Sequence, residues 1–158
     1  MNICPLCAKW AEEPEFRVAE LEWSFVLLNR DQFFPGYCFV VAKDHVTELF
    51  HLDPAERTIM VEEISAVAAA LAAVFRPDKV NYELLGNMVP HMHWHLVPRF
   101  RSDPLWPRPI WSEAHQELIL TPAEYAERVQ LIRESLATHL FGMTRKENVR
   151  QTESRMTK

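Results

Sequence analysis

Glycine and cysteine are both scarce in this 158-residue chain. The three glycines, Gly36, Gly86 and Gly142, lie far apart. A P-loop and a dinucleotide-binding fingerprint both need clustered glycines, so both are excluded. Three cysteines, an odd number, argue against a disulfide framework. The chain is therefore expected to work in a reducing compartment, the cytoplasm.

Membrane and nucleic-acid signals are also missing. No uninterrupted apolar run approaches the roughly 20 residues that a membrane span needs. Residues 1–10 lack the basic start and the apolar stretch of a signal peptide, so no leader is expected. With 17 Lys and Arg against 22 Asp and Glu, the net charge is −5, which argues against a nucleic-acid polymer as the main partner. Length and ordinary apolar content indicate one globular domain.

The apolar pattern predicts grouped strands and helices, which indicates an α+β fold. Two helix-start signatures, Asp53-Pro54-Ala55-Glu56 and Thr121-Pro122-Ala123-Glu124, each precede an apolar stripe at helical spacing. We expect roughly five antiparallel strands, at 16–22, 23–28, 37–42, 79–85 and 92–100. Two main helices are expected, one from Asp53 to just before Pro77 and one at 121–141.

Two segments lie outside this regular pattern. A proline-rich loop at 98–112 carries Trp106 and Trp111, which could stack on a nucleobase or clamp the loop. After a single domain at 1–141, residues 142–158 lack periodic apolar residues and are predicted to form a charged, flexible tail.

Three histidines alternate along one predicted strand. Side chains on a strand alternate between faces, so His91, His93 and His95 are expected on one face and Met92, Trp94 and Leu96 on the other. Such histidines could be merely solvent-exposed, could together hold a catalytic zinc, or could attack phosphorus.

Attack on phosphorus fits the composition best. A neutral imidazole has one nitrogen lone pair, and a backbone carbonyl that accepts from the other nitrogen would fix the tautomer. The middle histidine, His93, has neighbours on both sides and is the best-placed nucleophile. This chemistry needs neither a catalytic metal nor a glycine-rich loop.

The histidine strand and its upstream context resemble the histidine triad (HIT) family of nucleotide hydrolases and transferases. The resemblance covers roughly residues 1–100. It extends from His91-x-His93-x-His95 to Leu28-Asn29-Arg30, to the segment from Pro35 to His45, and to the helix start at Asp53. It is specific because these motifs occur in the family's order and spacing.

The resemblance implies a nucleotide hydrolase with a HIT-like fold, typically a homodimer whose sheets join. His93 would form a nucleotidyl-histidine intermediate by attack at the α-phosphorus of a phosphoanhydride or phosphoramidate. His95 would contact the phosphate, with His91 completing the triad, and Asn29 would bind the ribose. The substrates implied are small molecules, such as dinucleoside polyphosphates or adenylylated compounds, and no organic cofactor is implied.

Other features affect the choice of substrate and reaction. The turn at 86–90 is shorter than in many relatives, so Asn87 could replace their usual hydrogen-bond donor. Arg99 could meet outer phosphates or simply be solvated.

Nucleotidyl transfer with the same triad is one alternative to hydrolysis, although the transferase branch resembles HxHxQ and His95 favours hydrolysis. A nucleotide- or zinc-binding regulatory module with little turnover is another.

Cys4-Pro5-Leu6-Cys7 has the CxxC spacing. It could be a redox pair, two ordinary thiols, or half of a tetrahedral zinc site. Relatives with a similar Cys pair imply a structural zinc held by Cys4, Cys7, His45 and His91. His51 is the rival of His45 as a ligand.

Overall fold

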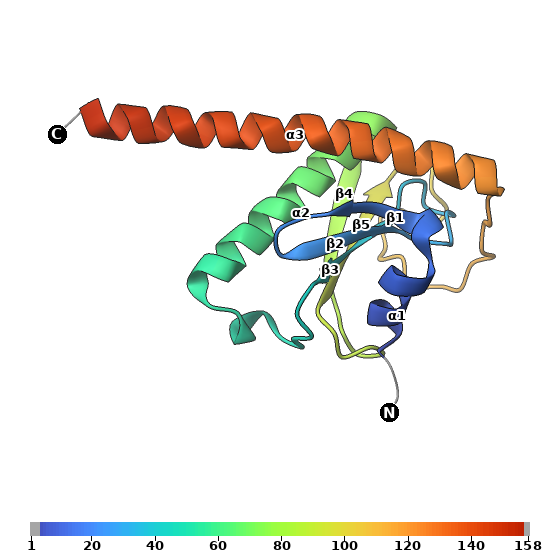
Figure 1. The fold of residues 1–158 in the computed structure, drawn as a ribbon. Helices are drawn as coiled ribbons and strands as arrows, with labels where there is room; N and C mark the ends of the chain where they lie inside the picture. The colour runs from blue at the N-terminus through green and yellow to red at the C-terminus, as the bar shows by residue number, and fades with distance from the viewer. Residues whose placement is uncertain (1–3, 157–158) are drawn as a thin grey trace.

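The computed structural model describes residues 4–156, and the side chains of residues 4–140. Figure 1 shows an open sheet with two long helices and a short N-terminal helix. In chain order the elements are α1 (Pro5–Glu12), the 3₁₀ turn η1 (Pro14–Phe16), β1 (Arg17–Glu20), β2 (Ser24–Leu28), β3 (Cys38–Ala42), the 3₁₀ turn η2 (Leu49–His51), α2 (Pro54–Phe75), β4 (Lys79–Leu84), β5 (His93–Arg99) and α3 (Pro122–Met156).

The five strands form one antiparallel sheet in the order β1-β2-β3-β5-β4. This confirms the predicted α+β class and the number of strands. Helices α2 and α3 pack against each other and contact strands of the sheet. The main hydrophobic core lies between these helices and the sheet, and it includes Val40, Leu71 and Ile132.

Helix α2 begins as its sequence predicts. The Asp53 carboxylate accepts from the backbone N–H groups of Ala55 and Glu56, and the Glu56 side chain accepts from the Asp53 N–H, which completes a capping box. Within the described part of the chain, α2 alone has the length and apolar composition that could cross a membrane. Its apolar face packs in the core, as in the central helix of many globular domains.

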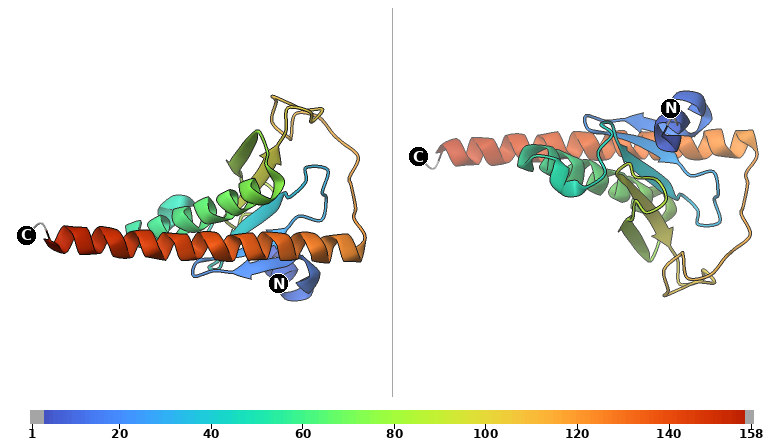
Figure 2. Two further views of the ribbon diagram at one scale, coloured as in Figure 1. Left: turned by 90° about the horizontal axis from the view of Figure 1, so that it is seen from above. Right: turned by 90° about the horizontal axis from the view of Figure 1, so that it is seen from below.

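Helix α3 is longer than its sequence pattern predicts. It continues to Met156 instead of ending near residue 141, and its C-terminal part extends beyond the sheet (Figures 1 and 2). The physical reason is local propensity: after Gly142 the chain has no proline and is rich in Arg, Lys, Glu and Gln, which favour helix without any packing partner.

The face of the sheet opposite the helices carries the alternate residues of β3 and β5. Phe39 lies opposite His95 in the register, and the two rings are 5.2 Å apart. A smaller apolar cluster adjoins these residues and packs under the segment that joins β5 to α3. It comprises Phe34, Tyr37, Val97, Leu105 and Ile110. The predicted separation into a core face with Leu96 and a histidine face with His93 and His95 is therefore confirmed for β5.

Candidate active site and metal cluster

The His93 side chain is held in one tautomer by the backbone. Its Nδ1 lies 2.6 Å from the carbonyl oxygen of His91, which can only accept, so Nδ1 carries the proton. The Nε2 lone pair of the neutral ring is therefore left for another partner. This is the arrangement that a nucleophilic histidine requires.

His95 lies beside His93, with the ring centres 4.8 Å apart. Its Nδ1 is 2.5 Å from the hydroxyl of Tyr37. Burial, and then the nearby His93, lower the pKa of His95 to about 4, so the ring is neutral near pH 7. Burial raises the pKa of Tyr37, which stays a neutral phenol that can donate to His95. Sequence reasoning missed Tyr37; its place directly after the Pro35-Gly36 turn was the available signal.

A pocket of about 650 Å³ opens beside His95. Asn29, the predicted ribose ligand, lines it, as do Tyr37 and Phe39. The amide of Asn29 donates to the Asp31 carbonyl at 3.1 Å, which orients the side chain at the end of β2. The structure therefore brings Asn29 and His95 to one pocket, with His93 adjacent to His95. The remaining lining residues are Arg30, Asp31, Ile110, Trp111, Glu113, Ala114, His115 and Glu117.

The third triad residue, His91, does not share a strand face with the other two, which corrects the prediction. β5 begins at His93, and His91 lies in the preceding loop. There its Nε2 donates to the Ala42 carbonyl at 2.8 Å, and burial lowers its pKa. With Nε2 bonded to Ala42 and Nδ1 facing Cys4 and Cys7, His91 has no ring nitrogen left for an ion shared with His93 and His95, which argues against one catalytic metal ion held by all three.

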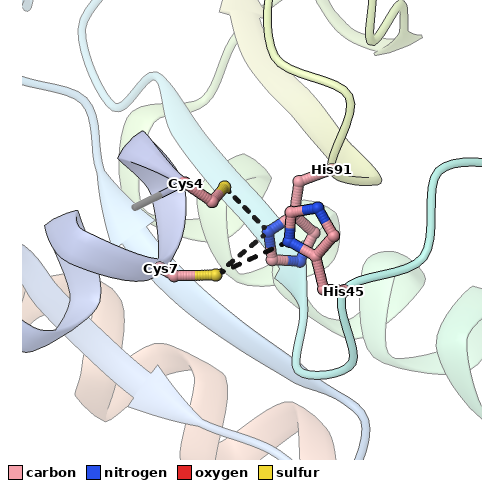
Figure 3. Close-up of side chains that lie close together, drawn as sticks. All are labelled: Cys4, Cys7, His45 and His91. Atoms are coloured by element: carbon pink, nitrogen blue, oxygen red, sulfur yellow. Dashed lines mark hydrogen bonds between the residues drawn. The ribbon is translucent and has the colours of Figure 1, made fainter. Parts of the chain in front are cut away.

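His91 instead faces the N-terminal cysteines. Because its Nε2 donates to Ala42, the Nδ1 lone pair is directed to the sulfurs, 3.4 Å from Cys4 Sγ and 3.5 Å from Cys7 Sγ (Figure 3). His45 Nδ1 lies 3.8 Å from Cys7 Sγ, and the four ligand atoms all lie within 4.8 Å of one another. His51, the rival ligand, is the last residue of η2, and its Nδ1 lies 3.3 Å from the Thr47 hydroxyl, outside this group.

The three sulfur–nitrogen separations of 3.4, 3.5 and 3.8 Å are close to those of a tetrahedral site. A zinc ion bonded to sulfur at about 2.3 Å and to nitrogen at about 2.1 Å would hold the two ligand atoms about 3.6 Å apart. Pro5 at the first helical position starts α1 directly after Cys4, and this short helix, which the sequence analysis did not predict, directs Cys4 and Cys7 to the same side. The cluster can therefore hold a metal ion.

Arg99 is not available to a substrate, which corrects its predicted role. The side chain is buried, and it donates to both carboxylate oxygens of Asp103, at 2.8 and 3.0 Å, and to the carbonyl of Arg108 at 3.0 Å. Arg99 thus fixes the proline-rich segment after β5. Asn87 is exposed in the loop between β4 and β5, and its substrate role stays a prediction.

The fold and the site together define a class of protein. An antiparallel sheet of five strands carries neighbouring histidines on a central strand, one with its tautomer fixed by the backbone, beside a pocket with an asparagine. A family model described as the HIT domain matches residues 11–102. The chain belongs to the histidine triad (HIT) family.

Individual relatives agree with this membership. A histidine triad protein from Bradyrhizobium japonicum has 30% identity and a TM-score of 0.71, over 76% of this chain and 89% of that one. A Zn-bound histidine triad family protein from Mycobacterium smegmatis has 25% identity and a TM-score of 0.62, over 85% and 94%.

A curated relative carries a name that states an activity. The bis(5'-nucleosyl)-tetraphosphatase (asymmetrical) of Schizosaccharomyces pombe is 28% identical over 85 residues, or 51% of this chain. The match spans 47% of that relative, about half of its length.

Proposed function

We propose that this protein is a nucleotide hydrolase that cleaves a phosphoanhydride or phosphoramidate at the α-phosphorus through a nucleotidyl-histidine intermediate. The observation that carries the proposal is the hydrogen bond from His93 Nδ1 to the His91 carbonyl, which leaves Nε2 as a nucleophile next to His95. Family membership and the relative named as a tetraphosphatase support a small nucleotide as substrate, such as a dinucleoside polyphosphate or an adenylylated compound.

The reaction then has two displacements. His93 Nε2 attacks the α-phosphorus, a P–N bond forms, and the bond to the leaving group breaks. The ring becomes a cationic imidazolium, and the His91 carbonyl that accepts from Nδ1–H stabilises this charge. Water next attacks phosphorus and the P–N bond breaks, its electron pair returning to Nε2. The oxygen of the water stays on the nucleoside monophosphate, its surplus proton passes to solvent and balances the proton taken up by the first leaving group, and the neutral His93 is restored.

His95 contributes as a neutral donor in this scheme. With Tyr37 donating to Nδ1, the proton of His95 is on Nε2, from which it can donate a hydrogen bond to a phosphate oxygen. Neutrality matters because a charged His95 would share a site with the imidazolium of His93.

The cysteine–histidine cluster is proposed to hold a structural zinc. Its four ligands would fill the coordination sphere and leave no open position for water, so the ion would support His91 without taking part in the chemistry. A homodimer in the cytoplasm remains the expected state of the protein.

The Tyr37–His95 hydrogen bond leads to a prediction for the pH profile. Protonation of His95 as the pH falls toward its pKa of about 4 should weaken catalysis, so the contribution of His95 to the pH dependence of kcat should lie near pH 4–5 instead of near 6.5. Tyr37→Phe should lower kcat by about tenfold with little change in KM, because the tautomer of His95 is no longer fixed. The check is the kcat and KM profile of both proteins from pH 4 to 8; a Tyr37→Phe protein with the kcat of the wild type across this range would contradict the assigned role.

The intermediate itself provides the test of the proposed function. We expect the wild type, mixed with diadenosine polyphosphates or an adenosine phosphoramidate and denatured at alkaline pH, to carry an adenylyl group on the peptide that contains His93. Peptide mass spectrometry locates this group. Turnover with no covalent adduct under rapid quench, or an adduct on another residue, would overturn the mechanism; an absence of turnover with the whole panel would overturn the hydrolase.

A further inference from the structure

The segment that joins β5 to α3 supplies half of the pocket wall, although it lies almost entirely outside the part of the chain that matches the HIT domain. The match ends at residue 102, whereas Ile110, Trp111, Glu113, Ala114, His115 and Glu117 all line the pocket. Figure 2 shows this segment leaving the tip of β5 and returning to the start of α3. We infer that it is the base-recognition element of the site, with Trp111 as the stacking surface; this inference rests on the proposed function.

The segment is fixed to the domain at both of its ends. Near β5, Arg99 holds Asp103 and the Arg108 carbonyl, and Leu105 and Ile110 are buried. Near α3, the Asp31 carboxylate accepts from the Leu118 N–H at 2.9 Å, and its other oxygen lies 2.7 Å from His115 Nε2. The pocket wall is therefore preorganised, and a ligand does not have to order it.

Trp111 is held in a geometry that leaves a ring face for a ligand. The indole N–H donates to the Glu83 carboxylate on β4, opposite His95 in the register. The ring meets His95 edge to face, with centres 5.2 Å apart, yet 54% of the residue is exposed. Since its single polar group is already bonded, the remaining surface suits a flat partner by stacking.

The charges of this wall indicate which part of a nucleotide it meets. The Glu117 carboxylate would repel a polyphosphate chain, whereas the Glu113 carboxylate on the same wall is ion-paired with Arg108. They can instead accept hydrogen bonds from the N–H groups of a base. His115 adds a second aromatic surface, whose far side is stacked on Phe33 with centres 4.4 Å apart. With Asn29 in the same pocket for the ribose and His95 for the phosphate, the base is the part that remains.

The experiment compares a ligand with and without its base. Calorimetry would measure the binding of AMP and of ribose 5-phosphate to the wild type, Trp111→Ala and Trp111→Phe. Trp106→Phe is the matched control, because Trp106 belongs to the same segment and lies against Arg101, outside the pocket lining. We expect AMP to bind the wild type at least about tenfold more tightly than ribose 5-phosphate.

Trp111→Ala should remove most of that preference, by weakening AMP about tenfold and leaving ribose 5-phosphate unchanged. Trp111→Phe should retain part of it, and Trp106→Phe all of it. A preference that Trp111→Ala leaves intact, or an equal weakening of both ligands, overturns the role of Trp111 in base recognition while the proposed hydrolase stands. A wild type that binds neither ligand overturns the proposed nucleotide site itself.

Discussion

Replacement of His93 by alanine is expected to lower kcat for nucleotide hydrolysis by about 10³-fold or more, since the covalent route disappears with the nucleophile. Binding should change little, because Asn29, Tyr37 and His95 still line the pocket. The measurement is steady-state turnover of a diadenosine polyphosphate, together with the affinity for AMP by calorimetry.

The control for this substitution is His139→Ala. His139 lies on α3, where its Nδ1 donates to the Ser135 carbonyl at 2.8 Å, away from the histidine strand. Loss of this imidazole should leave turnover at the wild-type level. A His93→Ala protein that turns over as fast as the control would show that another group attacks phosphorus.

The second large effect concerns the metal cluster. Cys4→Ser or Cys7→Ser should remove the bound zinc and lower the free energy of unfolding by several kcal/mol. The reason is that an ion that binds the native state and not the unfolded state stabilises the native state. The loss should be smaller than the roughly 10–16 kcal/mol of zinc-finger peptides, because this domain has a core of its own. Metal analysis and thermal unfolding of the purified proteins would measure both quantities.

His51→Ala separates the cluster from its surroundings. His51 is an exposed histidine close to His45 in the sequence and outside the four-ligand group. The His51→Ala protein should retain a full equivalent of zinc, whereas the His45→Ala protein should lose metal. A wild type that is purified without metal and gains no stability from added zinc would refute the proposed zinc site.

Much of the fold and of the site could be predicted from local patterns. The capping box of α2 and the alternation of His93 and His95 with Leu96 are properties of short segments, and the structure confirms them. The Cys4–Cys7 pair was identified by its spacing. Its helix α1 was not predicted, because the stability of so short a helix depends on what it packs against.

The wrong predictions for Arg99 and His91 depended on contacts that only the folded chain makes. In the sequence, Arg99 cannot be told from a solvated arginine. Only the structure shows that its guanidinium donates to Asp103 and to the Arg108 carbonyl. His91 has the spacing of a strand residue, but its ring bonds the carbonyl of Ala42 and contacts cysteines near the N-terminus instead of lying on the face of β5. The partners of His91 lie too far along the chain for a local pattern to contain them.

The position of His91 has a consequence for how the protein can be shortened. Its ring contacts sulfurs 87 and 84 residues earlier in the chain, while its own carbonyl sets the proton on His93. A fragment that starts after Cys7 would retain every triad histidine and every strand. It would nevertheless lose the contacts of Cys4 and Cys7 with His91, the residue whose carbonyl accepts from His93. Under the proposed mechanism, the N-terminal segment therefore supports the histidine strand through His91.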